Sequence, residues 1–230
     1  RQMNCHFGTR LLNENGDWKT QTDMMNSVSD ISCVSGQMPR IVGLAYASKL
    51  YRNNKNLSDM ENFSINGNEV VFGTIGDAST SEGHFWEAIN ACGVLQVPLI
   101  MSIWDDGYGI SVPSEYHTTR NDLSKALSGF QRSSKKENGY EIFTVHAWDY
   151  INLLKTYQKA EKLAREDHVP CIIHVKDVTQ PQGHTTSGSH ERYKSKERLN
   201  WEKDFCCIKR MREWIIENNF ASNSEIDIIA

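Results

Sequence analysis

The chain has 230 residues, of which 39% are hydrophobic and 23% are charged, and its formal net charge is -4 at pH 7. This length and apolar content predict one globular domain with a substantial core, spanning residues 1–230. The charges form no long block of one sign, and no run reaches the roughly 18 apolar residues that cross a bilayer. We therefore expect neither nucleic acid nor a membrane as a partner.

The six cysteines contain no C-x-x-C pair, and Cys171 lies within an apolar run. This pattern is typical of reduced thiols in a cytoplasmic protein, and it argues against a disulfide framework or a zinc site. The chain begins at Arg1 in a segment rich in polar residues, which would make a poor domain edge. We expect a cytoplasmic protein whose chain is a fragment of a longer one.

The first predicted elements form a strand, helix, strand unit that follows an initial helix. Apolar residues at helical spacing predict that first helix over 37–51, and a short apolar run predicts a buried strand over 69–75. Ser79 and Glu82 have the spacing of a capping box, which predicts a helix starting near Ser81. A second strand is predicted over 97–104. Two strands joined by such a helix are parallel and end at the same edge of the sheet.

Two more strand and helix pairs extend this alternation. Residues 141–145 predict a strand before a helix over 149–165, and residues 171–175 predict a strand before a long loop. A terminal helix is predicted from about residue 201 to residue 217. This order indicates an α/β fold with a mainly parallel sheet and helices on both faces. Ligands bind to such sheets at the carboxyl ends of the strands.

An acidic residue lies on a glycine-rich turn after each strand of the first unit. Asp77 follows Gly76, and Asp106 precedes Gly107. Two carboxylates together with backbone carbonyls suit Mg²⁺, and the N-terminus of the following helix favours a diphosphate. A single aspartate after a strand is often only a helix cap, so the prediction depends on the pair. The sequence therefore predicts a site for Mg²⁺ and a phosphorylated cofactor.

Several segments then identify a family. They are Gly76-Asp77-Ala78, Glu82-Gly83, Glu87-Ala88-Ile89-Asn90-Ala91 and Asp105-Asp106-Gly107-Tyr108-Gly109-Ile110-Ser111. Together they resemble the thiamin diphosphate motif of the α-type E1 component of 2-oxo acid dehydrogenase complexes, which act on pyruvate or branched-chain 2-oxo acids. The resemblance extends from Arg1-Gln2-Met3 through Gln37-Met38-Pro39 to Gly183-His184-Thr185-Thr186-Ser187. It implies a thiamin diphosphate-binding fold, with thiamin diphosphate and Mg²⁺ as cofactors.

The resemblance implies roles for individual residues. Asp77 and Asp106 would ligate Mg²⁺ through their side chains, and Tyr108 would ligate it through its backbone carbonyl. The cofactor-binding residues that it implies are Ser32, Val34, Gly76, Asp77, Ala78, Asp106, Tyr108, Ile110 and His184. Ser32 and Val34 match backbone contacts to the aminopyrimidine ring, although their local sequence equally fits a plain strand-to-helix connection.

His184 lies in a polar loop after the last predicted strand. A loop histidine taken alone is more often a solvated bystander. The family has its catalytic histidine in such a loop, so the resemblance implies that His184 stabilises charge and moves protons during acyl transfer. His190 is the competing candidate, and we expect it to contribute to the structure of the loop.

The sequence departs from the family pattern at two places. The family usually has Asn-Asn where this chain has Asp105-Asp106, and the extra negative charge beside a diphosphate is costly unless a basic group answers it. The family often has an arginine where this chain has Gln180. The missing cation would come from Arg120, from Lys176, or from chain that precedes residue 1.

The reaction that the resemblance implies is decarboxylation of a 2-oxo acid, with transfer of the acyl group to a lipoyl domain of the E2 acyltransferase. The family's activating glutamate comes from a β-type subunit or domain, so we expect an oligomer in which this chain holds half a site. One alternative is a catalytically silent, partner-binding module, which Gln180 and Asp105-Asp106 favour. Another alternative is a Mg²⁺-dependent phosphohydrolase, which fits the paired aspartates. This chain, however, has no nucleophile at the end of a first strand, where such an enzyme would need one.

Overall fold

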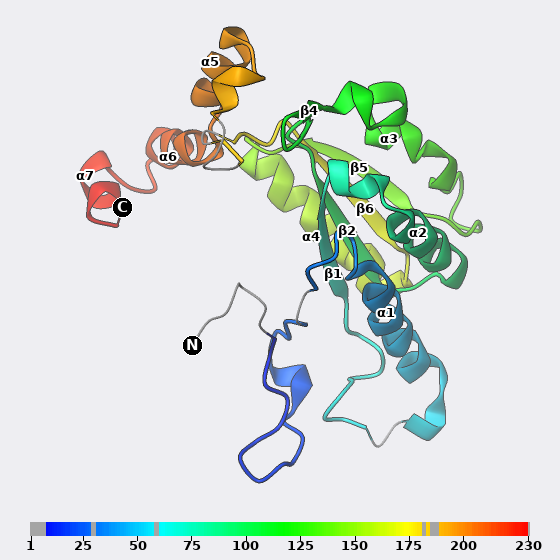
Figure 1. Cartoon of the computed structure of the whole chain (residues 1–230). Coiled ribbons are helices and arrows are strands. Elements are labelled where there is room, and N and C mark those ends of the chain that lie inside the picture. The colour runs from blue at the N-terminus through cyan, green and yellow to red at the C-terminus, as the bar shows by residue number, and fades with distance from the viewer. Residues whose placement is uncertain (1–7, 29–30, 58–59, 181–182, 185–188, 230) are drawn as a thin grey trace.

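The computed structural model of the chain is an α/β domain (Figure 1). It describes residues 8–28, 31–57, 60–180, 183–184 and 189–229. A four-stranded sheet has the order β1-β2-β6-β5, and all of its neighbouring strands are parallel. The strands are β1 (Val71–Gly76), β2 (Leu99–Trp104), β5 (Glu141–His146) and β6 (Cys171–Lys176). The predicted fold class and the parallel pairing of the first two strands are confirmed.

Helices and a small hairpin complete the described part of the chain. The α-helices are α1 (Met38–Asn53), α2 (Gly83–Leu95), α3 (Leu123–Ala126), α4 (Tyr150–Asp167), α5 (Lys196–Asp204), α6 (Cys207–Glu217) and α7 (Asn223–Ile229). The 3-10 turns are η1 (Gln21–Asp23), η2 (Lys55–Leu57), η3 (Ala78–Ser81), η4 (Ser114–Tyr116), η5 (Thr119–Asn121), η6 (Ser128–Phe130) and η7 (His190–Arg192). The hairpin consists of β3 (Tyr108–Gly109) and β4 (Val112–Pro113), which are antiparallel.

The sheet has a separate core on each face. Met101 and Ile172 point toward α1, α2 and α3, whereas Ile100 and Ile173 point toward α4, and all four side chains are 0% exposed. Full burial of one such aliphatic side chain contributes about 1.5 to 3 kcal/mol. Helices cover both faces of the central strands β2 and β6, so almost every residue of these two strands is buried.

The predicted capping box before the second helix is wrong. Residues 78–81 form the 3-10 turn η3, and Glu82 is an extended residue whose side chain makes no capping bond, so Ser79 and Glu82 are not a capping box. The Thr80 hydroxyl donates to the Asp77 carbonyl over 2.6 Å, and Ser35 Oγ donates to the Ser79 carbonyl over 2.7 Å. These bonds stabilise a tight turn before α2, which begins two residues later than predicted.

The single helix predicted at the C-terminal end is two helices, α5 and α6. The Phe205 ring follows α5, stacks on Trp201 at 5.2 Å and meets Trp148 edge-on at 5.3 Å. This packing turns the chain, and Cys206 has a non-helical backbone before α6 begins. Figure 1 shows α6 and α7 extending away from the sheet. Both helices lie wholly within the described residues, and none of their residues is buried.

The structure also describes most of the cysteines and the apolar character of the helices. The cysteines in the described ranges are Cys33, Cys92, Cys171, Cys206 and Cys207, and all of these are free thiols. Cys5 lies outside the described residues. Among the helices that the structure describes, none combines the length and the apolar character needed to cross a bilayer.

Candidate functional site

The two predicted acidic turns lie against each other at the carboxyl edge of the sheet. The register pairs Gly76 of β1 with Trp104 of β2, and the Asp77 amide donates to the Trp104 carbonyl over 3.0 Å. A Cβ atom added to Gly109 would lie 2.9 Å from the Cβ of Ala78, so the β3–β4 hairpin packs directly on η3. Glycine at position 109 therefore permits this close approach of the two turns.

Asp77 is a buried carboxylate with an unsatisfied oxygen. The residue is 3% exposed, and its Oδ2 atom has no hydrogen-bond partner among the residues that the structure describes. Burial, with the nearby carboxylates of Asp105 and Asp106, raises the pKa of Asp77 to about 8. A buried polar atom without a partner is unfavourable, and a bound cation would satisfy it. This chemistry fits the predicted role of Asp77 as a metal ligand.

Asp106 begins the second turn and has one carboxylate oxygen engaged. Its Oδ1 accepts a hydrogen bond from the Tyr108 amide over 3.1 Å, and Arg198 Nη2 donates to its carbonyl over 2.7 Å. Burial raises the pKa of Asp106, although the Tyr108 amide and the cations of Lys194 and Arg198 oppose that rise. Asp106 therefore lies in a neighbourhood where positive charge is already present.

The predicted metal ligands form a sparse set. Within the described ranges no group of three or more histidine, cysteine or acidic residues is arranged to hold a metal ion. Asp77 and Asp106 would supply two carboxylates and Tyr108 a carbonyl, which leaves further positions for phosphate and water. Mg²⁺ in proteins commonly keeps such a coordination shell.

The basic group that Asp105 requires is His174 in β6. His174 Nε2 lies 2.7 Å from Asp105 Oδ2, and the Gly107 amide donates to Asp105 Oδ1 over 2.9 Å. Burial alone would raise the pKa of Asp105, but the hydrogen bond and charge of His174 and the Gly107 amide hold that pKa below its usual value. Sequence reasoning missed His174, and its signal was a polar residue inside an apolar strand.

Lys176 and Arg120, two cations expected in place of the family's arginine, lie within the described residues. Lys176 lies at this edge, where its Nζ pairs with Asp122 Oδ2 at 3.1 Å and helps to lower the pKa of Asp105. Arg120 is exposed and has a φ of 66°. Lys194, which the sequence did not single out, has its Nζ 4.9 Å from the centre of the Tyr108 ring.

The segment expected at the aminopyrimidine ring lies next to η3. Ser32 is exposed and Val34 is 54% exposed, whereas Ser35 is buried and bonds to the Ser79 carbonyl over 2.7 Å. Ile110 lies at the tip of the β3–β4 hairpin, 57% exposed and with a φ of 60°. A left-handed backbone is unfavourable for a β-branched residue and is often found at functional sites. The cofactor roles of Ser32, Val34 and Ile110 stay predictions.

The two candidate histidines of the long loop differ in their surroundings. His184 is exposed, and its neighbours 181–182 and 185–188 lie outside the described residues. The catalytic role of His184 therefore stays a prediction. His190 begins η7, and its carbonyl accepts the Lys194 amide over 2.9 Å, which fits the structural role expected for it.

His117 is a residue at this site that sequence reasoning missed. Its Nε2 is buried without a hydrogen-bond partner in the described part of the chain, and its Nδ1 lies 2.9 Å from the Thr118 hydroxyl. The ring packs beside Gly109, and Ser81 Oγ donates to the His117 carbonyl over 3.1 Å. No motif or periodicity distinguishes this histidine in the sequence.

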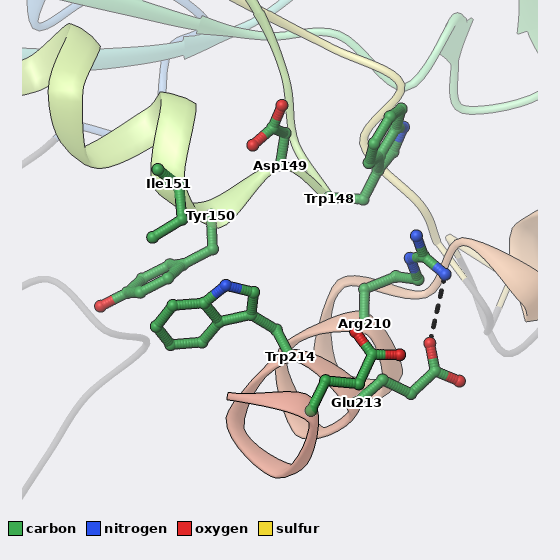
Figure 2. Close-up of a pocket in the computed structure, with 8 residues that line it drawn as sticks. Trp148, Asp149, Tyr150, Ile151, Arg210, Glu213 and Trp214 are labelled. Atoms are coloured by element: carbon green, nitrogen blue, oxygen red, sulfur yellow. Dashed lines mark hydrogen bonds and ion pairs between the residues drawn. The ribbon is translucent and has the colours of Figure 1, made fainter. Parts of the chain in front are cut away.

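A separate cavity of about 230 Å³ lies between the start of α4 and helix α6 (Figure 2). Its lining residues are Trp148, Asp149, Tyr150, Ile151, Arg210, Glu213, Trp214 and Glu217. Asp149 caps α4 through the Asn152 amide at 3.1 Å, and Arg210 pairs with Glu213 at 3.2 Å. The lining includes neither Asp77 nor Asp106, so this cavity is not the acidic site.

An α/β domain with two acidic turns meeting at the carboxyl edge of a parallel sheet has the layout of a cofactor-binding enzyme domain. The chain matches the family model of the dehydrogenase E1 component over residues 2–230, and it belongs to that family. The pyruvate dehydrogenase E1 component subunit alpha of Rickettsia bellii is 27% identical to it over 194 residues. The mitochondrial 2-oxoisovalerate dehydrogenase subunit alpha of Mus musculus is 24% identical over 222 residues. The predicted resemblance to α-type E1 components is confirmed.

The chain spans about half the length of these curated relatives. The Rickettsia match covers 84% of this chain and 52% of the relative, and the mouse match covers 96% and 42%. A crystal structure of transketolase from Campylobacter jejuni aligns with 64% of this chain and 20% of its own chain, with a TM-score of 0.46 and 18% identity. The fold assignment depends on the sheet and helices of this chain rather than on that structural match.

Proposed function

We propose that the chain binds thiamin diphosphate and Mg²⁺ as the α-type half of a 2-oxo acid dehydrogenase E1. The enzyme would decarboxylate a 2-oxo acid and transfer the acyl group to the lipoyl domain of an E2 acyltransferase. The main support for this proposal is the buried Oδ2 of Asp77, which lies at the carboxyl edge of the sheet and has no hydrogen-bond partner among the described residues. The chain that carries it belongs to the dehydrogenase E1 family.

The residues at the two turns have the chemistry that this cofactor requires. Asp77 and Asp106 would bind Mg²⁺ through carboxylate oxygens, and Tyr108 would add its carbonyl. Gly76 and Ala78 carry little or no side chain, which would leave room for a diphosphate. When bound, thiamin diphosphate would supply the nucleophilic carbon and the electron sink for decarboxylation.

Other residues of the chain would orient the cofactor and handle protons. Ser32 and Val34 would contact the aminopyrimidine ring from the segment that Ser35 docks on η3. Ile110 would contact the cofactor from the hairpin tip. The imidazole of His184 would donate a hydrogen bond to a developing oxyanion and move a proton during acyl transfer, because an imidazole can both donate and accept a proton.

The chain would act together with a β-type subunit or domain in an oligomer. Two curated relatives carry the name of an alpha subunit, and no residue of this sequence resembles the activating glutamate of the family. We therefore expect no steady decarboxylation of a 2-oxo acid by this chain alone.

A silent, partner-binding module is the alternative. Gln180 and Asp105-Asp106 favour it, whereas Gly76-Asp77, Tyr108 and His184 argue against it. Calorimetric titration of thiamin diphosphate with Mg²⁺ into the chain, with and without a β-type partner, separates the two functions. The enzyme requires saturable binding that Asp77→Ala abolishes and decarboxylation that appears only with the partner. Partner binding without cofactor binding would leave the silent module.

A further inference from the structure

A line of hydrogen bonds runs across the sheet to the turn after β2. Thr144 of β5 lies 2.8 Å from Ser124 of α3, measured between their hydroxyl oxygens. Ser124 Oγ lies 2.6 Å from His174 Nδ1, and His174 Nε2 lies 2.7 Å from Asp105 Oδ2. His174 is 0% exposed, so both of its ring nitrogens are satisfied inside the protein.

The partners fix the direction of these bonds. An ionised carboxylate only accepts hydrogen bonds, so His174 Nε2 donates to Asp105 in either protonation state of the ring. The Nδ1 atom of the neutral ring then accepts a hydrogen bond from the Ser124 hydroxyl, and the Ser124 oxygen can accept a hydrogen bond from the Thr144 hydroxyl. Ser124 and Asp105 hold the imidazole from both sides, which fixes its orientation and leaves the ring no free position.

Hydrogen bonds also hold Asp105 in place at the start of the acidic turn after β2. Its amide donates to the Val175 carbonyl over 2.9 Å, and its carbonyl accepts the Val178 amide over 3.0 Å. Its Oδ1 accepts the Gly107 amide over 2.9 Å. The side chain of Asp105 is therefore directed to His174 and Gly107, and the next residue of the turn is Asp106.

We propose that His174 is a positioning residue for the metal and cofactor site, because it holds Asp105 and thereby fixes the turn that presents Asp106 and Tyr108. This inference rests on the proposed function above. The role matches that of outer residues which orient metal ligands in other proteins without touching the metal. Ser124 supports it by holding the far side of the ring.

A serine, histidine and aspartate in series also suggest a nucleophilic triad, and the geometry opposes that function. The ring of His174 is wholly buried, and Ser124 Oγ is engaged with both Thr144 and the ring. The residues lining the cavity in Figure 2 include none of the three. A fluorophosphonate probe should therefore leave Ser124 unlabelled, and specific labelling of Ser124 would overturn the positioning role.

The main test is His174→Gln in the chain together with its β-type partner. Calorimetric titration with thiamin diphosphate and Mg²⁺ should show binding about 10- to 100-fold weaker than wild type, the usual effect of losing such an orienting residue. The matched control is His168→Gln. His168 is 7% exposed and bonds to the Gly67 carbonyl at 3.0 Å, just before β6 begins. The control should lose stability and keep its cofactor affinity.

A double-mutant cycle shows whether His174 acts through Asp105. Asp105→Asn should also weaken binding, and His174→Gln should add little in that background, because coupled residues are not additive. If His174→Gln does not fold, Ser124→Ala takes its place, with an expected loss of about 2- to 10-fold for one neutral hydrogen bond. Full additivity of the two single changes would overturn the coupling.

The outcomes separate the two proposals. A wild-type chain that binds no thiamin diphosphate and Mg²⁺ with its partner contradicts the proposed function. A wild-type chain that binds, with a folded His174→Gln variant of equal affinity, contradicts only the positioning role. An equal loss of affinity in His168→Gln would mean that stability alone accounts for the effect. With His174→Gln unfolded, wild-type affinity in Ser124→Ala would overturn the inference.

Discussion

Asp77→Asn should stabilise the metal-free chain, because the fold holds the Asp77 carboxyl in a place that disfavours its charge. Burial and two neighbouring carboxylates raise the pKa of Asp77 to about 8, from an ordinary value of 3.8. Between these two values the folded state binds a proton that the unfolded state has lost. Stability must therefore fall as the pH rises through this window, and it levels off above pH 8.

The size of the effect follows from the slope of this linkage. One proton bound only by the folded state changes the free energy of unfolding by about 1.4 kcal/mol per pH unit. From pH 6 to pH 8 the wild-type chain should lose about 2 kcal/mol through Asp77, after allowance for partial ionisation near the folded pKa. Asparagine has a similar shape and no charge, so the variant lacks this part of the pH dependence.

Urea unfolding at pH 6, 7 and 8 without divalent cations measures the difference between Asp77→Asn and wild type. Saturating Mg²⁺ and thiamin diphosphate should narrow the difference in stability between Asp77→Asn and wild type. A ligand at about 100 times its Kd stabilises the wild type by about 2.7 kcal/mol, and the variant should gain little.

Asp122→Asn is the matched control for the sign of the effect. Burial would raise the pKa of Asp122, but the Lys125 amide and the Lys176 side chain hold that pKa below its usual value. This variant should therefore lose stability at neutral pH, where Asp77→Asn gains it. A difference between Asp77→Asn and wild type that stays constant from pH 6 to pH 8 would refute the reasoning about Asp77.

Three further variants test other parts of the site. Glu202 is 1% exposed and bonds to two cationic side chains, so Glu202→Ala should cost about 3 to 5 kcal/mol in denaturant unfolding, and a loss below 1 kcal/mol would contradict the buried pairing. His184→Ala should lower acyl transfer to a lipoyl domain by roughly 10² to 10⁴-fold with little change in cofactor affinity, and an unchanged rate would remove it from the mechanism. Gly109→Ala places a Cβ atom 2.9 Å from the Cβ of Ala78 and should weaken cofactor binding. The control is Gly43→Ala, whose added Cβ has no atom within 4 Å and should leave cofactor binding unchanged. Equal cofactor affinities of the two variants in calorimetry would contradict the close packing of the turns.

The parallel unit around the acidic turns was predictable because its signals are local. The strands β1 and β2 are short apolar runs joined by one amphipathic helix, and a crossover of this kind has few possible geometries. Asp77 comes directly after β1, and Asp106 comes after β2 with only Asp105 between, so their meeting at one edge needed no long-range information. The capping box failed because Ser35, far away in sequence, bonds to Ser79 and helps to fix a 3-10 turn instead.

The partners of the acidic turns were not predictable in the same way. The sheet order β1-β2-β6-β5 places β6 beside β2, although β5 precedes β6 along the chain. His174 and Asp105 are 69 residues apart, and hydrophobic periodicity gives no register between strands that are not consecutive. The same holds for Arg198, which lies 92 residues from the Asp106 carbonyl that it contacts. The signal for His174 was a polar residue inside an apolar run, and sequence reasoning missed it.

Three aspartates, Asp77, Asp105 and Asp106, lie at the carboxyl edge of the sheet, and their charges explain why a cation is expected there. Asp105 is answered by His174 from the neighbouring strand, and Asp106 lies near Lys194 and Arg198 from the C-terminal side of the chain. Asp77 has a buried oxygen that no described residue satisfies, and both neighbouring carboxylates oppose its ionisation. A divalent ion between the turns, with Asp77 and Asp106 as ligands, would remove that opposition and would leave the pair of Asp105 and His174 in place. The structure thus pairs Asp105 with a basic side chain, and the carboxylates of Asp77 and Asp106, whose pKa values are both raised, lie where the proposed Mg²⁺ would bind.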